Sequence, residues 1–427
     1  MIITQGVAPL YPGLCASALT ARAAYSKWLK HTSFISSYLH FSPFYYLRSL
    51  YSIIVADVVF FLYFCSMKII VAVDSFKGCL TSAQAGQAVE EAVRCCCPEA
   101  DVVTCVVSDG GDGMLEAFCQ AYGAKLHTVS VHDPLMRPIQ ARYGITTHGM
   151  AIIESAQACG LTLMSADERN PLRATTYGVG EMVADAVRRG CRSFIVGLGG
   201  SGTSDAGMGM LRALVDAFAP AGGHIDDVLA GQMADCSFTL ACDVDNPLCG
   251  PQGAAEVYAP QKGASREDVR TLDRRAAQFA RMSAAHFGFD CSDYPGAGAA
   301  GGLGYAFMQY FQARRCSGAD MLLDALDMRG IMQEADVVIT GEGSADRQTL
   351  MGKMPSRVLS CAADCRVPVW LLAGRLRDTS LLRDAGFARL SQVTPEGCDL
   401  AEAMQAEVAV ANIQRVVKDW LDSVKFV

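Results

Sequence analysis

Residues 68–78 read KIIVAVDSFKG, and this stretch decides the fold. The run from Lys68 to Val73 predicts a buried strand, because a continuous series of aliphatic residues suits a strand covered on both faces. The run ends at Asp74, the chain turns at Gly78, and residues 82–94 then follow a helical period. A strand, a polar turn and a helix in this order predict one unit of a parallel α/β sheet.

Short apolar runs alternate with helical periods along the rest of the chain. We predict further strands at 102–107, 194–198, 238–242, 337–340 and 369–373, and helices at 112–122, 180–189, 266–287 and 401–424. Between 124 and 163 the segments alternate in polarity, which is typical of antiparallel strands. The pattern therefore predicts an α/β fold with two lobes and an active site in the cleft between them.

Composition excludes several classes of protein. The 427-residue chain carries a formal net charge of −8 and has no Lys/Arg-rich run, so we expect no nucleic-acid partner. Its 18 cysteines are scattered through apolar segments without a C-x-x-C pair, and Cys361 and Cys365 are spaced too widely for one. Such cysteines are typical of small buried residues in a reducing compartment, which predicts a cytoplasmic protein.

The first 66 residues differ from the rest. They are rich in aromatic residues, and Asp57 is their only acidic residue. The apolar run at 50–65 is shorter than the ~20 residues of a typical membrane span, and Asp57 lies within it. We predict that residues 1–66 come from a wrong translation start, with Met67 as the true first residue. A membrane-proximal anchor is the alternative, although we expect no stable membrane association.

Five predicted strand ends carry an acidic residue, and four of them also carry glycine. One Asp at a strand end is usually a helix cap or a turn residue, but five together indicate a site. Glycine-rich turns that open into helices present backbone N–H groups to phosphate, and carboxylates suit Mg²⁺. The five loops are 74–78, 108–113, 199–205, 243–246 and 341–346.

Familiar nucleotide motifs are absent or incomplete. Residues 197–202 fit G-x-G-x-x-G, but no acidic residue ends a strand about 20 residues later. The chain contains no G-x-x-x-x-G-K-[ST] loop, no protein-kinase signature and no G-x-S-x-G. Any phosphoryl transfer must therefore use another scaffold.

The residues from Met67 to about Val417 resemble bacterial glycerate kinases of the type that forms 2-phosphoglycerate. The order and spacing of ten short strings carry the resemblance: DSFKG at Asp74, DGGDG at Asp109, NPL at Asn170, GVGE at Gly178, GGSGTSDAG at Gly199, ACDVDNPL at Ala241, PQKGAS at Pro260, PGAGAAGG at Pro295, VITGEG at Val338 and GK at Gly352.

The resemblance implies ATP-dependent, Mg²⁺-dependent phosphorylation of D-glycerate. It also implies two unlike α/β domains with Rossmann-like or flavodoxin-like parallel sheets. One domain is discontinuous, which we place at 67–125 plus 293–427, and the inserted domain then spans 126–292. The chain departs from the family pattern in three places: Asp112 replaces Glu, residues 201–207 read SGTSDAG rather than SATNDGG, and Ser344 replaces Arg. The departures leave the acidic groups in place and bear on substrate affinity more than on the reaction.

Under this interpretation Asp205 abstracts the hydroxyl proton, and Asp74 and Lys77 complete the catalytic set. Lys77, Lys262 and Lys353 all sit in loop or glycine-flanked contexts, where a lysine neutralises phosphoryl charge or is simply a solvated surface cation. Candidates for holding Mg²⁺ or its waters are Asp243, Glu342 and Asp346. The predicted substrate- and phosphate-binding residues are Ser75, Asp109, Gly110, Gly111, Gly113, Gly199, Gly200, Ser201, Thr203, Gly296, Gly298, Gly301, Lys353 and Arg375, the last as a ligand of the glycerate carboxylate.

Two alternatives remain open at this stage. The same scaffold could phosphorylate another small hydroxy acid, because such acids differ by few groups. A non-catalytic sensor of nucleotide or glycerate would keep the glycine turns but lose acidic groups, which are present here. The sequence does not indicate an oligomeric state.

Overall fold

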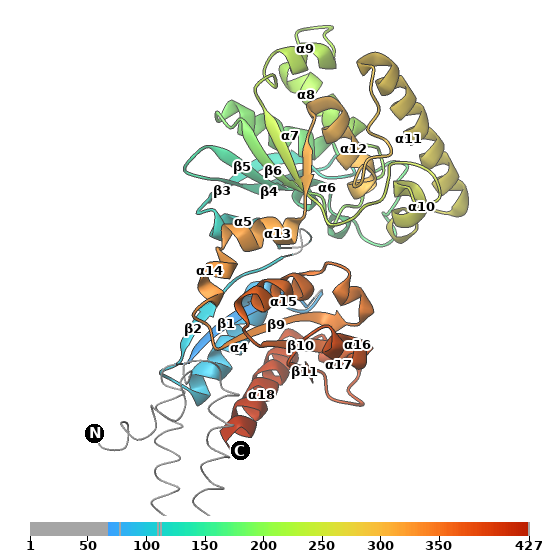
Figure 1. The fold of residues 1–427 in the computed structure, drawn as a ribbon. Helices are drawn as coiled ribbons and strands as arrows, with labels where there is room; N and C mark the ends of the chain where they lie inside the picture. Colours follow the sequence, from blue (N-terminus) through green and yellow to red (C-terminus); the bar gives the residue numbers. More distant parts are fainter. Residues whose placement is uncertain (1–66, 77, 109–110, 112, 426–427) are drawn as a thin grey trace, which may run out of the picture. The chain divides into compact units, whose positions relative to one another are not determined.

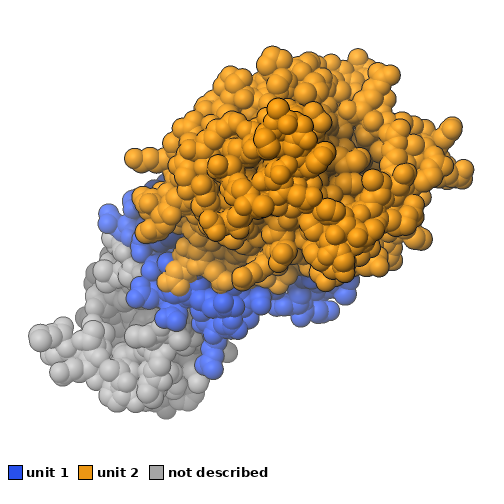
Figure 2. All heavy atoms as spheres, turned by 90° about the horizontal axis from the view of Figure 1, so that it is seen from above, with its two compact units in different colours: residues 1–105, 328–350, 358–427 blue, residues 106–327, 351–357 orange. Residues whose placement is uncertain are grey.

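The computed structural model describes residues 67–425 except 77, 109–110 and 112 (Figure 1). The chain forms two compact units, which Figure 2 colours separately. Among the described residues, unit 1 holds 67–105, Met328–Leu350 and 358–425, and unit 2 holds Val106–Asp327 and Met351–Arg357. The domain limits expected from the sequence and the shared cleft stay predictions.

Unit 1 is built on a five-stranded sheet in which all neighbouring strands are parallel. The strand order is β11 (Arg389–Gln392), β10 (Val369–Leu376), β9 (Val337–Ala345), β1 (Lys68–Val73) and β2 (Asp101–Thr104). Strand β1 is buried along its whole length beyond Lys68, which explains its uninterrupted apolar sequence. The helices are α4 (Ser82–Cys96), α14 (Met328–Met332), η4 (Arg347–Leu350), α15 (Met354–Cys365, which begins in unit 2), α16 (Thr379–Asp384), α17 (Leu400–Ala403) and α18 (Ala406–Lys425).

Helix α4 begins at a reciprocal cap. The backbone N–H of Gln84 donates to Thr81 Oγ1 at 3.2 Å, and Thr81 N–H donates to Gln84 Oε1 at 2.9 Å. Two of the free amides at the helix start are satisfied in this way. Further along, Val93 packs with Ile413 and Trp420 of α18 in the core of unit 1.

Unit 2 is built on a mixed six-stranded sheet. Its order is β3 (Lys125–His132), β4 (Pro138–Ile145), β5 (Met150–Glu154), β6 (Ser193–Gly197), β7 (Ser237–Ala241) and β8 (Arg314–Cys316). The pairs from β3 to β5 are antiparallel, and those from β5 to β8 are parallel. Its helices are α5 (Met114–Ala121), α6 (Ala156–Cys159), η2 (Leu161–Leu163), α7 (Tyr177–Arg188), α8 (Met208–Phe218), α9 (Ile225–Ala230), α10 (Ala254–Tyr258), η3 (Pro260–Lys262), α11 (Arg266–Phe287), α12 (Ala299–Phe311) and α13 (Gly318–Ala325).

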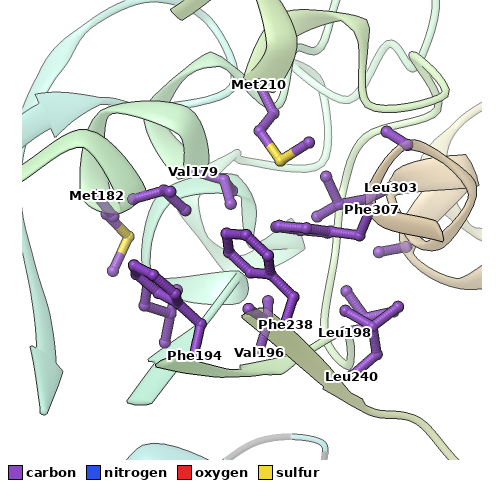
Figure 3. Packing of buried hydrophobic residues seen from close by; sticks show 14 of the residues in the cluster. Val179, Met182, Phe194, Val196, Leu198, Met210, Phe238, Leu240, Leu303 and Phe307 are labelled. Carbon is purple, nitrogen blue, oxygen red and sulfur yellow. The ribbon is translucent and has the colours of Figure 1, made fainter. Parts of the chain in front are cut away.

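Aromatic rings fill the core of unit 2 (Figure 3). Phe194 of β6 stacks on Phe238 of β7 with ring centroids 4.6 Å apart, and Phe307 of α12 lies 5.1 Å from Phe238. Such pairs contribute about 0.5–1.5 kcal/mol each beyond their burial. The stack therefore fixes β6 and β7 against α12, and with them the loops that leave these elements.

The predicted α/β class is confirmed, and several elements agree closely. Strand β1 and helix α11 have the predicted bounds, and the segment from 124 to 163 does contain antiparallel strands. Two differences have clear causes. The predicted helix 401–424 is broken between α17 and α18, and β8 was missed because its sequence RRC is largely exposed and lacks an apolar pattern.

Across the described residues, every helix is too short or too polar to cross a membrane. The apolar run at 50–65 lies outside the described residues.

Candidate functional site

Three parallel strands of unit 2 end level with one another. The register pairs Glu154 of β5 with Gly197 of β6, and Gly197 with Ala241 of β7. Loops that follow such strand ends share one edge of the sheet, where ligands bind in open α/β folds. The loops after β5, β6 and β7 therefore begin as neighbours.

Residues 199–207, which we call the β6 loop, are tied to the segment that follows β5. Gly202 N–H donates to Cys159 O at 2.7 Å, and Leu161 N–H donates to Gly200 O at 2.9 Å. Gly160 and Ser201 form an isolated bridge between the two segments. The polar residues of the β6 loop are thus held by main-chain bonds rather than left in a flexible turn.

The glycine-rich segment 296–302 closes on the β6 loop from another side. A Cβ on Gly301 would lie 2.0 Å from Thr203 O, and one on Gly298 would lie 2.2 Å from Pro247 O. Ala206 N–H donates to Gly301 O at 3.0 Å. These two glycines permit backbone to approach backbone, and their predicted contact with phosphate stays a prediction.

Lys262 is buried beneath the β6 loop, with only 2% of its surface exposed. Its Nζ donates to Thr203 O at 2.7 Å and to Ser201 Oγ at 3.0 Å. Burial lowers the pKa of Lys262 to about 8, although the acidic groups of Cys159 and Asp205 act in the opposite direction. From the sequence, Lys262 was predicted only as a cation in a loop, and the string PQKGAS was the one signal of a larger role.

The carboxylate of Asp205, near the end of the β6 loop, accepts several hydrogen bonds from the protein. Its Oδ2 accepts from Thr176 N–H at 2.8 Å, Thr176 Oγ1 at 2.9 Å and Gly209 N–H at 3.0 Å, and more weakly from Thr175 Oγ1 at 3.3 Å. Its Oδ1 accepts from Gly207 N–H at 3.1 Å. Asp205 therefore joins the starts of α7 and α8. A carboxylate offers about four acceptor positions, so the protein itself occupies them, and the predicted role as a base stays a prediction.

Among the described residues, four polar side-chain atoms are buried without a hydrogen-bond partner. They are Ser155 Oγ, Thr203 Oγ1, Ser204 Oγ and Arg169 Nε. Most buried polar atoms in native proteins are satisfied, so each exception calls for an explanation. Arg169, Ser204, Thr175 and Thr176 were not predicted as site residues from the sequence.

Unit 1 carries a second group of predicted residues at the carboxyl edge of its sheet. Asp74 follows β1, and its N–H donates to Gly341 O at 2.9 Å, beside Glu342 of β9. Thr349 Oγ1 donates to Glu342 Oε1 at 2.5 Å and accepts from Asp346 N–H at 3.0 Å. Thr349 therefore links two of the three predicted magnesium ligands.

The remaining predicted residues are distributed as follows. In unit 2 the structure brings together Gly199, Gly200, Ser201, Thr203, Asp205, Gly298 and Gly301, whereas Gly296 lies against Arg315. Ser75 and the exposed Arg375 lie in unit 1. Asp243, Gly111, Gly113 and Lys353 lie in unit 2, where Asp243 Oδ2 accepts from Gly318 N–H at 3.2 Å. Lys77, Asp109, Gly110 and Asp112 lie outside the described residues. Within the described part of the chain, no three His, Cys, Asp or Glu side chains gather as a metal site.

The fold and the site define an α/β protein in which a buried lysine, Lys262, donates hydrogen bonds to a glycine-rich loop. A sequence profile described as the glycerate kinase family matches residues 69–424, so the chain belongs to that family. It is 38% identical to a glycerate kinase of Bacillus subtilis (strain 168) over 376 residues, which cover 84% of this chain and 98% of that protein. It is also 38% identical to a glycerate 2-kinase of Escherichia coli (strain K12) over 329 residues, covering 73% of this chain and 86% of that protein.

A solved structure agrees with this placement. The crystal structure of a protein from Salmonella typhimurium LT2, assigned as glycerate kinase 2, matches with a TM-score of 0.70 and 32% identity. The match covers 84% of this chain and 98% of that chain. The resemblance expected from the sequence is confirmed.

We predict that Gly301→Ala is far more costly than Gly288→Ala. Both glycines have positive φ, +66° and +77°, but a Cβ on Gly288 meets nothing within 4 Å. Gly288→Ala should lower the free energy of unfolding by about 1 kcal/mol, and Gly301→Ala by at least about 3 kcal/mol, because it also displaces Thr203 O. Urea unfolding measures both, and equal losses would contradict the close approach.

We predict a pH-dependent stability signature for Lys262. Its folded pKa of about 8 lies below the ordinary lysine pKa of 10.5. Below about pH 8 both states are protonated, and the cost of burying the charge is present in full. Between these pKa values the unfolded chain binds a proton that the folded protein does not, so the contribution of Lys262 to stability rises with pH.

The comparison with Lys262→Met isolates this effect, because thiols and tyrosines titrate in both proteins. The free energy of unfolding of the wild type minus that of the variant should rise by up to about 3 kcal/mol from pH 8 to 10.5. Urea titrations at several pH values give this difference. A difference that stays flat would show that Lys262 is not buried as a charge.

Proposed function

We propose that the protein transfers the terminal phosphoryl group of ATP to the 2-hydroxyl of D-glycerate, giving 2-phosphoglycerate and ADP. The bond between the γ-phosphorus and its bridging oxygen breaks, the glycerate O2 forms the new P–O bond, and the hydroxyl proton leaves to a base. Family membership and the 38% identity to a protein named glycerate 2-kinase support the proposal. Retention of the acidic loops argues against a non-catalytic sensor.

The observation that carries the proposal is the pair of hydrogen bonds that the buried Lys262 donates to the β6 loop. A buried ammonium bonded to Thr203 O and Ser201 Oγ gives this edge of the sheet a fixed positive charge. Preorganised positive charge and backbone amides favour an anionic substrate and the charge that develops during phosphoryl transfer. A hydroxy acid and a nucleotide are both anions.

Mg²⁺ suits the predicted carboxylates, of which Glu342 and Asp346 lie in unit 1 and Asp243 lies in unit 2. It usually takes one or two protein carboxylates and completes its shell with water and substrate phosphates, so a cluster of three is not required. Glu342 and Asp346, linked through Thr349, offer oxygen ligands, and Asp243 is the third candidate. When bound, Mg²⁺ supplies positive charge to the phosphates of ATP. Lys77 and Lys353 are proposed to steady the phosphoryl group, and Asp205 to receive the hydroxyl proton.

The reaction is proposed to take place in the cytoplasm. Cys105, Cys119 and Cys159 are buried thiols without disulfides, and burial raises the pKa of each. Unpaired thiols in apolar surroundings are typical of a reducing compartment.

We predict that the full-length protein with ATP, Mg²⁺ and D-glycerate yields 2-phosphoglycerate, and ³¹P NMR tests this directly. The 2-phosphate ester lies on a CH group and splits into a doublet, whereas the 3-phosphate ester lies on a CH₂ group and splits into a triplet. Parallel reactions with tartronate, lactate and erythronate rank other hydroxy acids. No phosphoester from glycerate, or a better product from another acid, would overturn the assignment.

We predict that Asp205→Asn lowers kcat by ~10²–10⁴, as loss of a base or key electrostatic partner does. An amide NH₂ in place of one oxygen also faces the N–H donors of Thr176 and Gly209, so the melting temperature should fall as well. Asp216→Asn on the exposed side of α8 is the matched control and should keep normal turnover. Coupled ADP release measures kcat, and near-normal turnover by Asp205→Asn would refute the role.

A further inference from the structure

We propose that Arg169, assisted by the hydroxyl of Ser204, binds the carboxylate of the hydroxy-acid substrate. The proposal rests on the proposed function and names the residues of unit 2 that recognise one group of the substrate. It starts from two of the buried polar atoms that lack partners.

Among the residues that the structure describes, no anion pairs with the guanidinium of Arg169. Its Nε is buried without a hydrogen-bond partner, and within the described residues its side chain forms no ion pair. The preceding residue, Glu168, is engaged by Arg137 Nη1 at 2.7 Å and by Ser165 N–H at 3.0 Å. A buried guanidinium nitrogen without an acceptor is costly, and a bound anion would remove that cost.

A short series of contacts connects Arg169 with the β6 loop. The main chain of Arg169 lies against Gly263, where a Cβ would come within 2.5 Å of Arg169 O. Gly263 has a φ of +94°, which suits only glycine there, and it follows Lys262 directly. Lys262 Nζ in turn donates a hydrogen bond to the carbonyl oxygen of Thr203, the residue before Ser204. Arg169 and Ser204 are therefore connected through Gly263, Lys262 and Thr203.

Ser204 is held on both sides while its own hydroxyl is unused. Thr203 is bound by Lys262, and Asp205 is bound by the starts of α7 and α8. The Ser204 Oγ is buried without a partner. A hydroxyl whose backbone is fixed in this way can donate to a ligand without first becoming ordered.

The carboxylate is the substrate group that fits best. A guanidinium presents paired N–H donors in a plane that matches the two oxygens of a carboxylate, and such bonds are stronger than neutral ones. In a 2-hydroxy acid the reacting hydroxyl lies one carbon from the carboxylate. Ser204 and Asp205 are likewise adjacent, so a carboxylate held at Ser204 brings the 2-hydroxyl toward the predicted base. Arg375 in unit 1 stays the competing prediction.

Steady-state kinetics of the full-length protein test the inference. Arg169→Met should raise the KM for D-glycerate about 100-fold while the KM for ATP stays within about threefold, because loss of a charge-assisted pair costs about a factor of 10–150. Arg169→Lys should recover part of the loss, and Ser204→Ala should show a smaller effect of the same kind. Arg173→Met is the matched control, because Arg173 is an exposed arginine on the same loop, and it should leave both KM values unchanged.

A neutral analogue separates carboxylate binding from structural damage. Arg169→Met should weaken competition by D-lactate about as much as it raises the KM for D-glycerate, and it should leave competition by D-glyceramide unchanged. Equal weakening of both inhibitors, a loss confined to ATP, or a glycerate-specific loss in Arg375→Met alone would each overturn the inference. Melting temperatures confirm that the variants are folded.

Failure of the proposed function is recognised separately. It would appear as a wild-type protein without turnover on glycerate. Isothermal titration of D-glycerate and D-lactate into wild type and Arg169→Met then reads binding without turnover. Binding lost in the variant would sustain the carboxylate site, and binding that is absent or unchanged would refute it.

Discussion

The bond from Lys262 to Thr203 O is the interaction on which the site in unit 2 depends. Placing an ammonium group at 2% exposure costs several kcal/mol unless hydrogen bonds replace its water. Thr203 O and Ser201 Oγ supply two of these bonds, and both belong to the β6 loop. The loop and the lysine therefore stabilise each other, and neither is expected to keep its position without the other.

The rest of the site is arranged around backbone rather than around side chains. Gly298 and Gly301 let the glycine-rich segment 296–302 approach Pro247 O and Thr203 O at distances that any Cβ would prevent. Asp205 gathers amides from α8 together with groups of Thr175 and Thr176. These contacts leave little room for reorganisation, which is the condition under which fixed dipoles and charges contribute most to catalysis.

The sequence predicts those features that short-range patterns control. The apolar run of β1 and the period of α11 gave their bounds, and the strand-end rule located the β6 loop. Burial of Lys262 could not be predicted, because it depends on Thr203, far away in the chain, and an isolated lysine is usually a surface residue. Arg169 was missed because its significance lies in the lack of a hydrogen-bond acceptor for its Nε among the described residues. Residue type alone does not reveal that.

Lys262 and Arg169 show how two neighbouring cations take different roles. Gly263 follows Lys262 and lies against Arg169. Lys262 donates to the β6 loop, whereas Arg169 Nε has no acceptor among the described residues. An ammonium is a compact charge that suits two oxygens of a folded loop, and a guanidinium is a planar fork that suits an incoming carboxylate. Exchanging the two residues would leave the net charge unchanged and remove both fits. The identity of each cation, and not only its charge, therefore matters for the site.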